Sequence, residues 1–157
     1  MHSRIFTVGH DSEISELFLW DVAIRFDGGI EYLVEEEGKA FDASVDWLCS
    51  YLEDNKVKIK REGNTLKIEK DSFIDFRIKE KQDRTASILA ELNNPLKEKQ
   101  FKAYKDLTST LSQSEKGGFL FYSEENGMTS LDDLLSDYAN EHGEIELHLA
   151  QSFDYHS

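Results

Sequence analysis

The chain has 157 residues, of which 39% are hydrophobic and 11% aromatic, a composition that suits one folded domain and excludes an intrinsically disordered chain. Its 18 basic and 32 acidic residues give a net charge of −14, which opposes binding to nucleic acid or to an anionic membrane. No apolar run is long enough to span a bilayer.

A strand and a hairpin are predicted near the N-terminus. Residues 4–8 are rich in β-branched and aromatic side chains and predict a strand. Residues 18–26 carry apolar side chains at alternate positions, and Asp-Gly-Gly at 27–29 favours a hairpin turn, with 30–35 as the returning strand. Helical spacing leaves a helix as the alternative for 18–26. We expect Glu35–Glu37 where the chain leaves the sheet, because charges there discourage edge-to-edge pairing.

Residues 42–54 are predicted to form an amphipathic helix. Its apolar side chains recur at the i, i+3, i+4, i+7 spacing, at Val45, Leu48, Cys49 and Leu52. Either Asp42 or Ser44 is expected to cap its N-terminus. Cys49 lies on the apolar face, so we expect it to behave as a small core residue rather than as a nucleophile.

A second hairpin is predicted from residues 56–61 and 65–70, around a turn at 62–64. Residues 73–79 are expected to add a third strand, with its alternate apolar side chains inward. The outward lysines of the hairpin are interpreted as protection of a strand edge rather than as a surface for nucleic acid.

Helices are predicted in the second half of the chain. Residues 84–93 have helical apolar spacing, and Asn94-Pro95 marks the start of the next helix, with proline at the first helical position. That helix should present one shared face and end at Gly117-Gly118. The face comprises Phe101, Tyr104, Thr108 and Leu111.

The helix at 129–141 has the spacing of a capping box at its start. Thr129 with Asp132, or Ser130 with Asp133, can exchange hydrogen bonds between the side chain of one residue and the backbone of the other. Both pairs stay open at this point.

The elements predict a single α+β domain over residues 1–150, with hairpins near 18–35 and 56–79. Strands near 119–123 and 144–149 complete a mainly antiparallel sheet packed by about four helices. Residues 151–157 are expected to be a loose tail.

Charge is distributed unevenly along the chain. Residues 1–54 have a net charge of −10, residues 55–105 of +6 and residues 106–157 of −10. The basic middle either compensates the acidic ends within the fold or creates a dipolar surface that steers a charged partner. The N-terminal segment lacks the apolar core of a signal peptide, and a single cysteine excludes an internal disulfide, so we expect a cytoplasmic protein.

One candidate metal site and no cofactor site are found. Glu144, Glu146 and His148 alternate with apolar residues and share one strand face, a donor set that suits a divalent cation. The alternative is the ordinary polar face of a half-buried strand. Phosphate-loop, dinucleotide and catalytic patterns are absent from the sequence, so we expect no cofactor and no enzyme activity.

The acidic clusters favour a protein-binding module, such as an immunity-type or inhibitor protein that neutralises a basic partner. The expected contacts are carboxylates with nearby aromatic anchors: Glu35, Glu36, Glu37, Asp132, Asp133, Tyr32, Trp47 and Tyr51. The alternatives are an inhibitor that mimics DNA and a metal-dependent enzyme acting on a small molecule. No membrane partner and no direct contact with nucleic acid are expected.

Overall fold

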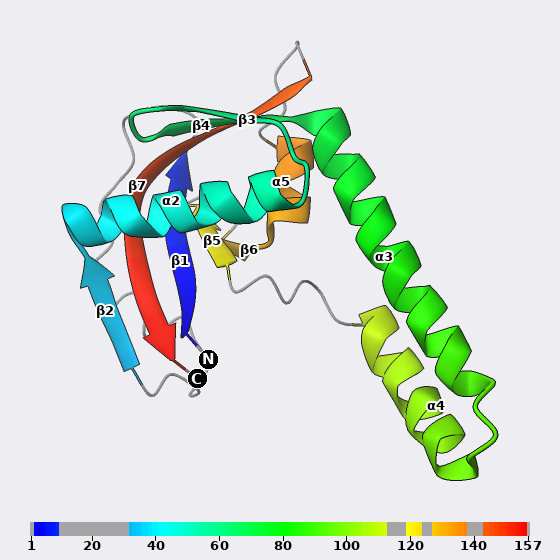
Figure 1. The fold of residues 1–157 in the computed structure, drawn as a ribbon. Helices are drawn as coiled ribbons and strands as arrows, with labels where there is room; N and C mark the ends of the chain where they lie inside the picture. The colour runs from blue at the N-terminus through cyan, green and yellow to red at the C-terminus, as the bar shows by residue number, and fades with distance from the viewer. Residues whose placement is uncertain (1, 10–31, 113–118, 124–126, 138–142, 157) are drawn as a thin grey trace.

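A seven-stranded sheet forms the centre of the computed structural model, which describes residues 2–9, 32–112, 119–123, 127–137 and 143–156 (Figure 1). The strands are β1 (His2–Gly9), β2 (Tyr32–Glu36), β3 (Ile59–Glu62), β4 (Thr65–Glu69), β5 (Phe119–Ser123), β6 (Gly127–Thr129) and β7 (Glu144–His156). The helices are α2 (Lys39–Asp54), α3 (Lys70–Leu92), α4 (Lys97–Ser112) and α5 (Leu131–Asp137). The predicted single α+β domain is confirmed.

The long strand β7 organises the sheet. One of its edges pairs with β1, while the other pairs first with β4 and then with β2. The β1–β5 pair is parallel, and the remaining described pairs are antiparallel. The expectation of a loose tail is wrong for residues 151–156, because neighbours on both edges of β7 take up this segment and bury Phe153 and Ser152 completely.

The main core lies between α2 and one face of the sheet. Val45, Leu48 and Leu52 are fully buried on α2, and Phe6 and Leu147 are fully buried on the strands of the same cluster. Because side chains alternate along a strand, Ile5 joins a smaller cluster with Tyr122 and Phe153.

The start of α2 differs from the prediction. The helix begins at Lys39, after Gly38 with a positive φ of 53°, and no side-chain hydrogen bond caps it. Asp42 instead lies in the first turn and pairs with Arg61. Ser44 is buried, and its hydroxyl accepts a hydrogen bond from Arg4 instead of capping the helix.

The hairpin of β3 and β4 is confirmed, but the third strand at 73–79 is wrong. This segment and the predicted helix at 84–93 belong to one helix, α3, of 23 residues. The side chains that pack inward are Phe73, Phe76 and Arg77, at helical spacing. The alternate apolar pattern was therefore accidental, and Ile78, expected to point inward, is 49% exposed.

The helix α4 is confirmed, but its expected apolar face is not buried. The helix packs through Ala103, which is 4% exposed, whereas Phe101 and Tyr104 are 64% and 66% exposed. The prediction of proline at the first helical position is wrong, because Pro95 lies two residues before Lys97, where the helix begins. The Oδ1 atom of Asn94 accepts a hydrogen bond from the Leu96 amide. The side chains of Thr108 and Leu111 are not among those described.

Strand β5 is buried as predicted, and it forms a short hairpin with β6. The described part of the last predicted helix is α5. The strand-or-helix alternative at 18–26, the turn at 27–29 and the helix end at 117–118 lie outside the described residues. None of the described helices has the length and apolar character needed to cross a membrane.

Candidate functional site

The acidic triplet Glu35–Glu37 is divided between the interior and the surface. Glu36 forms an ion pair with Arg4 (Nε–Oε1 3.0 Å) and accepts hydrogen bonds from the hydroxyls of Ser44 (2.5 Å) and Ser152 (2.8 Å). Glu35 accepts a hydrogen bond from the Gln151 side chain (2.7 Å). Glu37 is exposed. Two of these three carboxylates therefore connect β2 to its neighbours.

The pair Asp132 and Asp133 also has internal roles. Both oxygens of Asp132 accept hydrogen bonds from the guanidinium of Arg77, at 2.8 and 2.9 Å, and Arg77 is only 9% exposed. Asp133 accepts from the Ser130 amide (3.4 Å), and its own amide donates to the Ser130 hydroxyl (3.3 Å). This confirms the Ser130–Asp133 capping box among the two predicted alternatives.

Two of the three aromatic residues predicted as anchors, Trp47 and Tyr51, lie along α2, and the third, Tyr32, begins β2. Trp47 is 41% exposed and contacts the Phe119 ring at a centroid distance of 4.7 Å. The guanidinium carbon of Arg4 lies 5.4 Å from the centroid of the Trp47 ring. Tyr51 is half-buried between Phe119 and Phe76. The side chain of Tyr32 is not described. The structure thus brings Glu36 and Trp47 together around Arg4.

The structure brings two of the three residues of the predicted metal site, Glu146 and His148, close together. The Nδ1 atom of His148 lies 2.9 Å from the Thr65 hydroxyl, and its Nε2 lies 3.5 Å from Glu146. Glu144 lies opposite Glu69 in the sheet. Within the described residues, no group of three or more His, Cys, Asp or Glu side chains could hold a metal ion.

The lysines of the β3–β4 hairpin are compensated locally. Lys60 and Lys67 both pair with Glu62, and Lys58 pairs with Glu69. The hydrogen bond and charge of Lys60 lower the pKa of Glu62, while Glu62 raises the pKa of Lys60. These positive charges therefore have partners on their own hairpin.

The helices α3 and α4 form an arm, residues 70–112, that projects from the sheet (Figure 1). Its base is anchored, because Phe73 is in the main core, Phe76 contacts Tyr51, and Arg77 binds Asp132. Along the arm, α4 packs against α3. The distal part of the arm therefore has α3 and α4 as its main supports.

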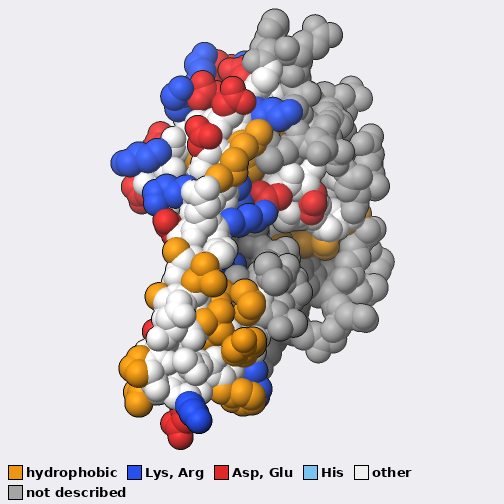
Figure 2. Space-filling model, turned by 90° about the vertical axis from the view of Figure 1, so that its right-hand side faces the viewer, with side chains coloured by type: hydrophobic (Ala, Val, Ile, Leu, Met, Phe, Trp, Pro, Cys, Tyr) orange, Lys and Arg blue, Asp and Glu red, His pale blue; other side chains and the backbone are white. Residues whose placement is uncertain are grey.

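Most of the exposed large apolar side chains of the described residues lie on this arm: Ile78, Leu89, Leu96, Phe101 and Tyr104, at 49% to 66% exposure. Elsewhere the described residues expose only Val34 and Trp47 in this way. Figure 2 shows hydrophobic side chains gathered on the lower, distal part of the arm, with charged side chains concentrated nearer its base.

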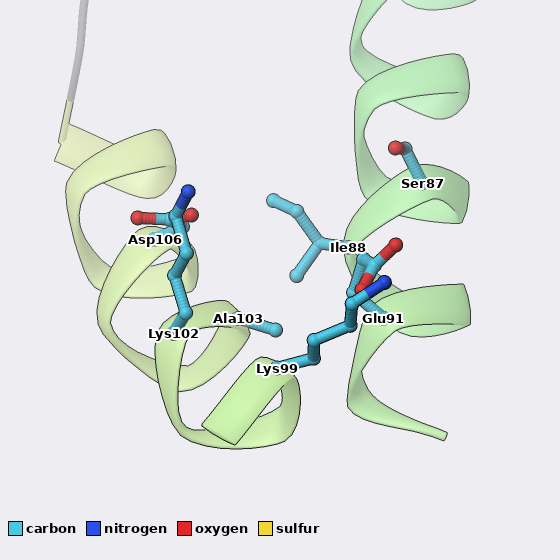
Figure 3. A pocket seen from close by; sticks show the side chains of 7 residues that line it. All are labelled: Ser87, Ile88, Glu91, Lys99, Lys102, Ala103 and Asp106. Carbon is cyan, nitrogen blue, oxygen red and sulfur yellow. The ribbon is translucent and has the colours of Figure 1, made fainter. Parts of the chain in front are cut away.

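A pocket of about 420 Å³ lies between α3 and α4 (Figure 3). Its apolar lining comes from Ile88 and Ala103, which point towards one another, while Lys99 extends across towards the side of α3 that carries Glu91. The rest of the lining is Ser87, Lys102 and Asp106. The described lining has no histidine or cysteine, and its charged side chains are Glu91, Lys99, Lys102 and Asp106, so the pocket is a groove of mixed charge.

The lysines of α4 differ from those of the sheet. Lys97, Lys99, Lys102 and Lys105 are exposed, and none of them has an ion pair within the described part of the chain. The ammonium of Lys105 lies 5.3 Å from the Phe101 ring centroid. One side of α4 therefore combines exposed aromatic rings with unpaired positive charge.

The sequence indicated the shared face of α4 but not its exposure. The available signal was composition, because four lysines within nine residues leave little of the helix surface for burial. Comparison with protein-family models, curated proteins and solved structures finds no match for this chain.

Proposed function

We propose that this protein is a protein-binding module whose contact surface is the arm. The observation that carries the proposal is the exposure of Leu89, Phe101 and Tyr104 on a projecting helical hairpin. Exposed apolar side chains that lie in a group mark interaction surfaces. Their apolar surface does not stabilise the fold while it is in water, but it can stabilise a complex when a partner buries it.

The chemistry of α4 supports this role. Aromatic side chains are frequent anchors of protein interfaces, since they bury a large area with few rotatable bonds. Phe101 and Tyr104 make little contact with their own core, so their area remains available to a partner. The flanking lysines add charge that favours an acidic partner surface and a faster encounter.

An inhibitor that neutralises a basic partner remains the second candidate. Outside the arm the chain has nine basic and 25 acidic residues, a net charge of −16. Exposed Glu37, Glu53 and Asp54 contribute to that charge without ion pairs in the described structure. Glu36 and Asp132 already form ion pairs within the fold, with Arg4 and Arg77. Because these two predicted contact residues are used internally, the arm is the better-supported contact surface.

A retention experiment separates these candidates. Immobilised wild-type protein, a Phe101→Ser/Tyr104→Ser variant and a matched Val34→Ser control are each exposed to host lysate. Retained proteins are then quantified by mass spectrometry. We expect a specific protein to be retained by the wild type and by the control, and lost by the arm variant. Retention unchanged by the arm substitutions would contradict the proposal, and loss on Glu37→Lys with strong salt dependence would favour the inhibitor.

A further inference from the structure

We infer that the arm binds a second copy of this chain, with α4 of one copy lying against α2 of the other. The inference rests on the proposed function, because it names the partner of the same surface. It starts from two exposed helix faces of opposite charge, each with an exposed aromatic side chain at its centre.

The first face belongs to α4. Lys97, Phe101, Tyr104 and Lys105 follow the i, i+4, i+7, i+8 spacing, which places them along one side of the helix. All four are exposed. The arrangement is an aromatic pair flanked by positive charges that lack ion pairs within the described residues.

The second face belongs to α2. Trp47 is exposed there, and the small exposed residues Ala43 and Ser50 lie one turn to either side of it. Small residues allow another helix to approach closely around the indole ring. Glu53 and Asp54 follow at the C-terminal end, exposed and without ion pairs in the described structure. This face therefore carries negative charge, opposite to the positive charge of the α4 face.

Charge selects this pairing over two others. If this face of α4 bound the same face of another copy, Lys97 and Lys105 would meet Lys97 and Lys105, and like charges across an interface are unfavourable. Nucleic acid would also meet the lysines, but the net charge of −16 outside the arm repels a phosphate backbone. The acidic α2 face supplies both the aromatic contact and the opposite charge.

A two-fold symmetric dimer satisfies both faces at once. Each copy contributes one arm and one α2 face, so the contact forms twice with the same residues. Trp47 of each copy is then covered by Phe101 and Tyr104. Because Lys97 and Lys105 lie on opposite sides of these rings along the helix, one of the two lysines approaches Glu53 and Asp54. The projection of the arm from the sheet makes α4 accessible to another molecule.

Sedimentation velocity across a wide concentration range tests the inference on the full chain. We expect the wild type to approach twice its 18.1 kDa monomer mass. Lys97→Glu/Lys105→Glu and Glu53→Lys/Asp54→Lys should each sediment as monomers. An equimolar mixture of these two variants should regain the dimer mass, because each arm then meets an α2 face of opposite charge.

Several outcomes would overturn the inference. These are a monomeric wild type at every concentration, a dimer unaffected by either charge reversal, a mixture that stays monomeric, and a complex whose ultraviolet absorbance shows nucleic acid. Circular dichroism of each variant confirms folding, which these exposed positions should not disturb. A monomeric wild type whose arm still retains a host protein would overturn only the second copy as partner and leave the proposed function intact.

Discussion

The sheet with α2 and the arm use aromatic side chains in opposite ways. Phe6, Phe121 and Phe153 are fully buried in the sheet, whereas Phe101 and Tyr104 on the arm are mostly in solvent. Both regions have regular amphipathic patterns in the sequence. The difference shows that periodicity predicts which residues share a face but does not predict whether another element covers that face.

The two regions also differ in how their charges are compensated. Around the sheet, Arg4 and Arg61 each bind two carboxylates, and Arg77 at the base of the arm binds Glu80 and Asp132. On α4 the lysines have no such partners within the described structure. Matched substitutions in the two regions should therefore differ in their effect on stability.

The largest expected effect is the loss of a buried side chain in the sheet. Leu147→Ala should lower the free energy of unfolding by about 2–5 kcal/mol, because it removes buried methyl groups and leaves a cavity. The matched change Leu89→Ala on the arm should alter it by about 0.5 kcal/mol or less. Urea denaturation measures both, and equal losses would contradict the distinction between the two regions.

The next effect concerns the joint between the arm and α5. Arg77→Met should cost about 1–3 kcal/mol, because Asp132 loses two hydrogen bonds in a site with limited solvent. Arg84→Met is the control, since its pair with Glu80 is partly exposed and 3.6 Å long. If the two variants have equal unfolding free energies, the Arg77–Asp132 contact does not anchor the arm.

A smaller loss is expected at the start of α5. Ser130→Ala removes the hydroxyl that accepts from the Asp133 amide and should cost about 1 kcal/mol of stability. Thr129→Val keeps the shape of its side chain and should have little effect, because its hydroxyl contacts are both 3.5 Å. A larger loss for Thr129→Val, measured by thermal denaturation, would reverse the assignment of the cap.

The smallest effect is on the reactivity of Cys49. Burial raises the pKa of its thiol, so less of it is thiolate at mildly alkaline pH than in the unfolded chain. Alkylation by iodoacetamide at pH about 8 should therefore be slower in the native protein than in urea, when each rate is compared with that of a free thiol in the same solvent. Equal or faster native alkylation would show that the thiol lies outside the packed face of α2.

The sequence allowed the correct prediction of elements that have a clear turn or a single periodicity. The β3–β4 hairpin has Gly63 with a positive φ of 62° at its turn, and α2 has a continuous apolar face. Residues 73–79 were misassigned because Ile74, Phe76 and Ile78 fit a strand, while the inward set of Phe73, Phe76 and Arg77 fits a helix. A short segment with both periods is decided by tertiary contacts.

The candidate site was harder to predict than the fold. The local sequence shows the acidic clusters, but the residues that donate hydrogen bonds to their carboxylates are distant in the chain. Examples are Ser152 for Glu36 and Arg77 for Asp132. The strand at residues 151–156 likewise depends on pairing with β1 and β2 rather than on its own composition. Exposure of the arm depends on the packing of the whole chain, and the lysine content of α4 was the local signal that pointed to it.

We propose that the aromatic side chains of α4 serve binding rather than folding. The most direct test is equilibrium urea unfolding of the Phe101→Ser/Tyr104→Ser variant, at a protein concentration low enough to limit association. We predict a free energy of unfolding within about 0.5 kcal/mol of the wild type. A loss of about 2 kcal/mol or more would show that these rings are buried in the folded chain, and would contradict their assignment to a binding surface.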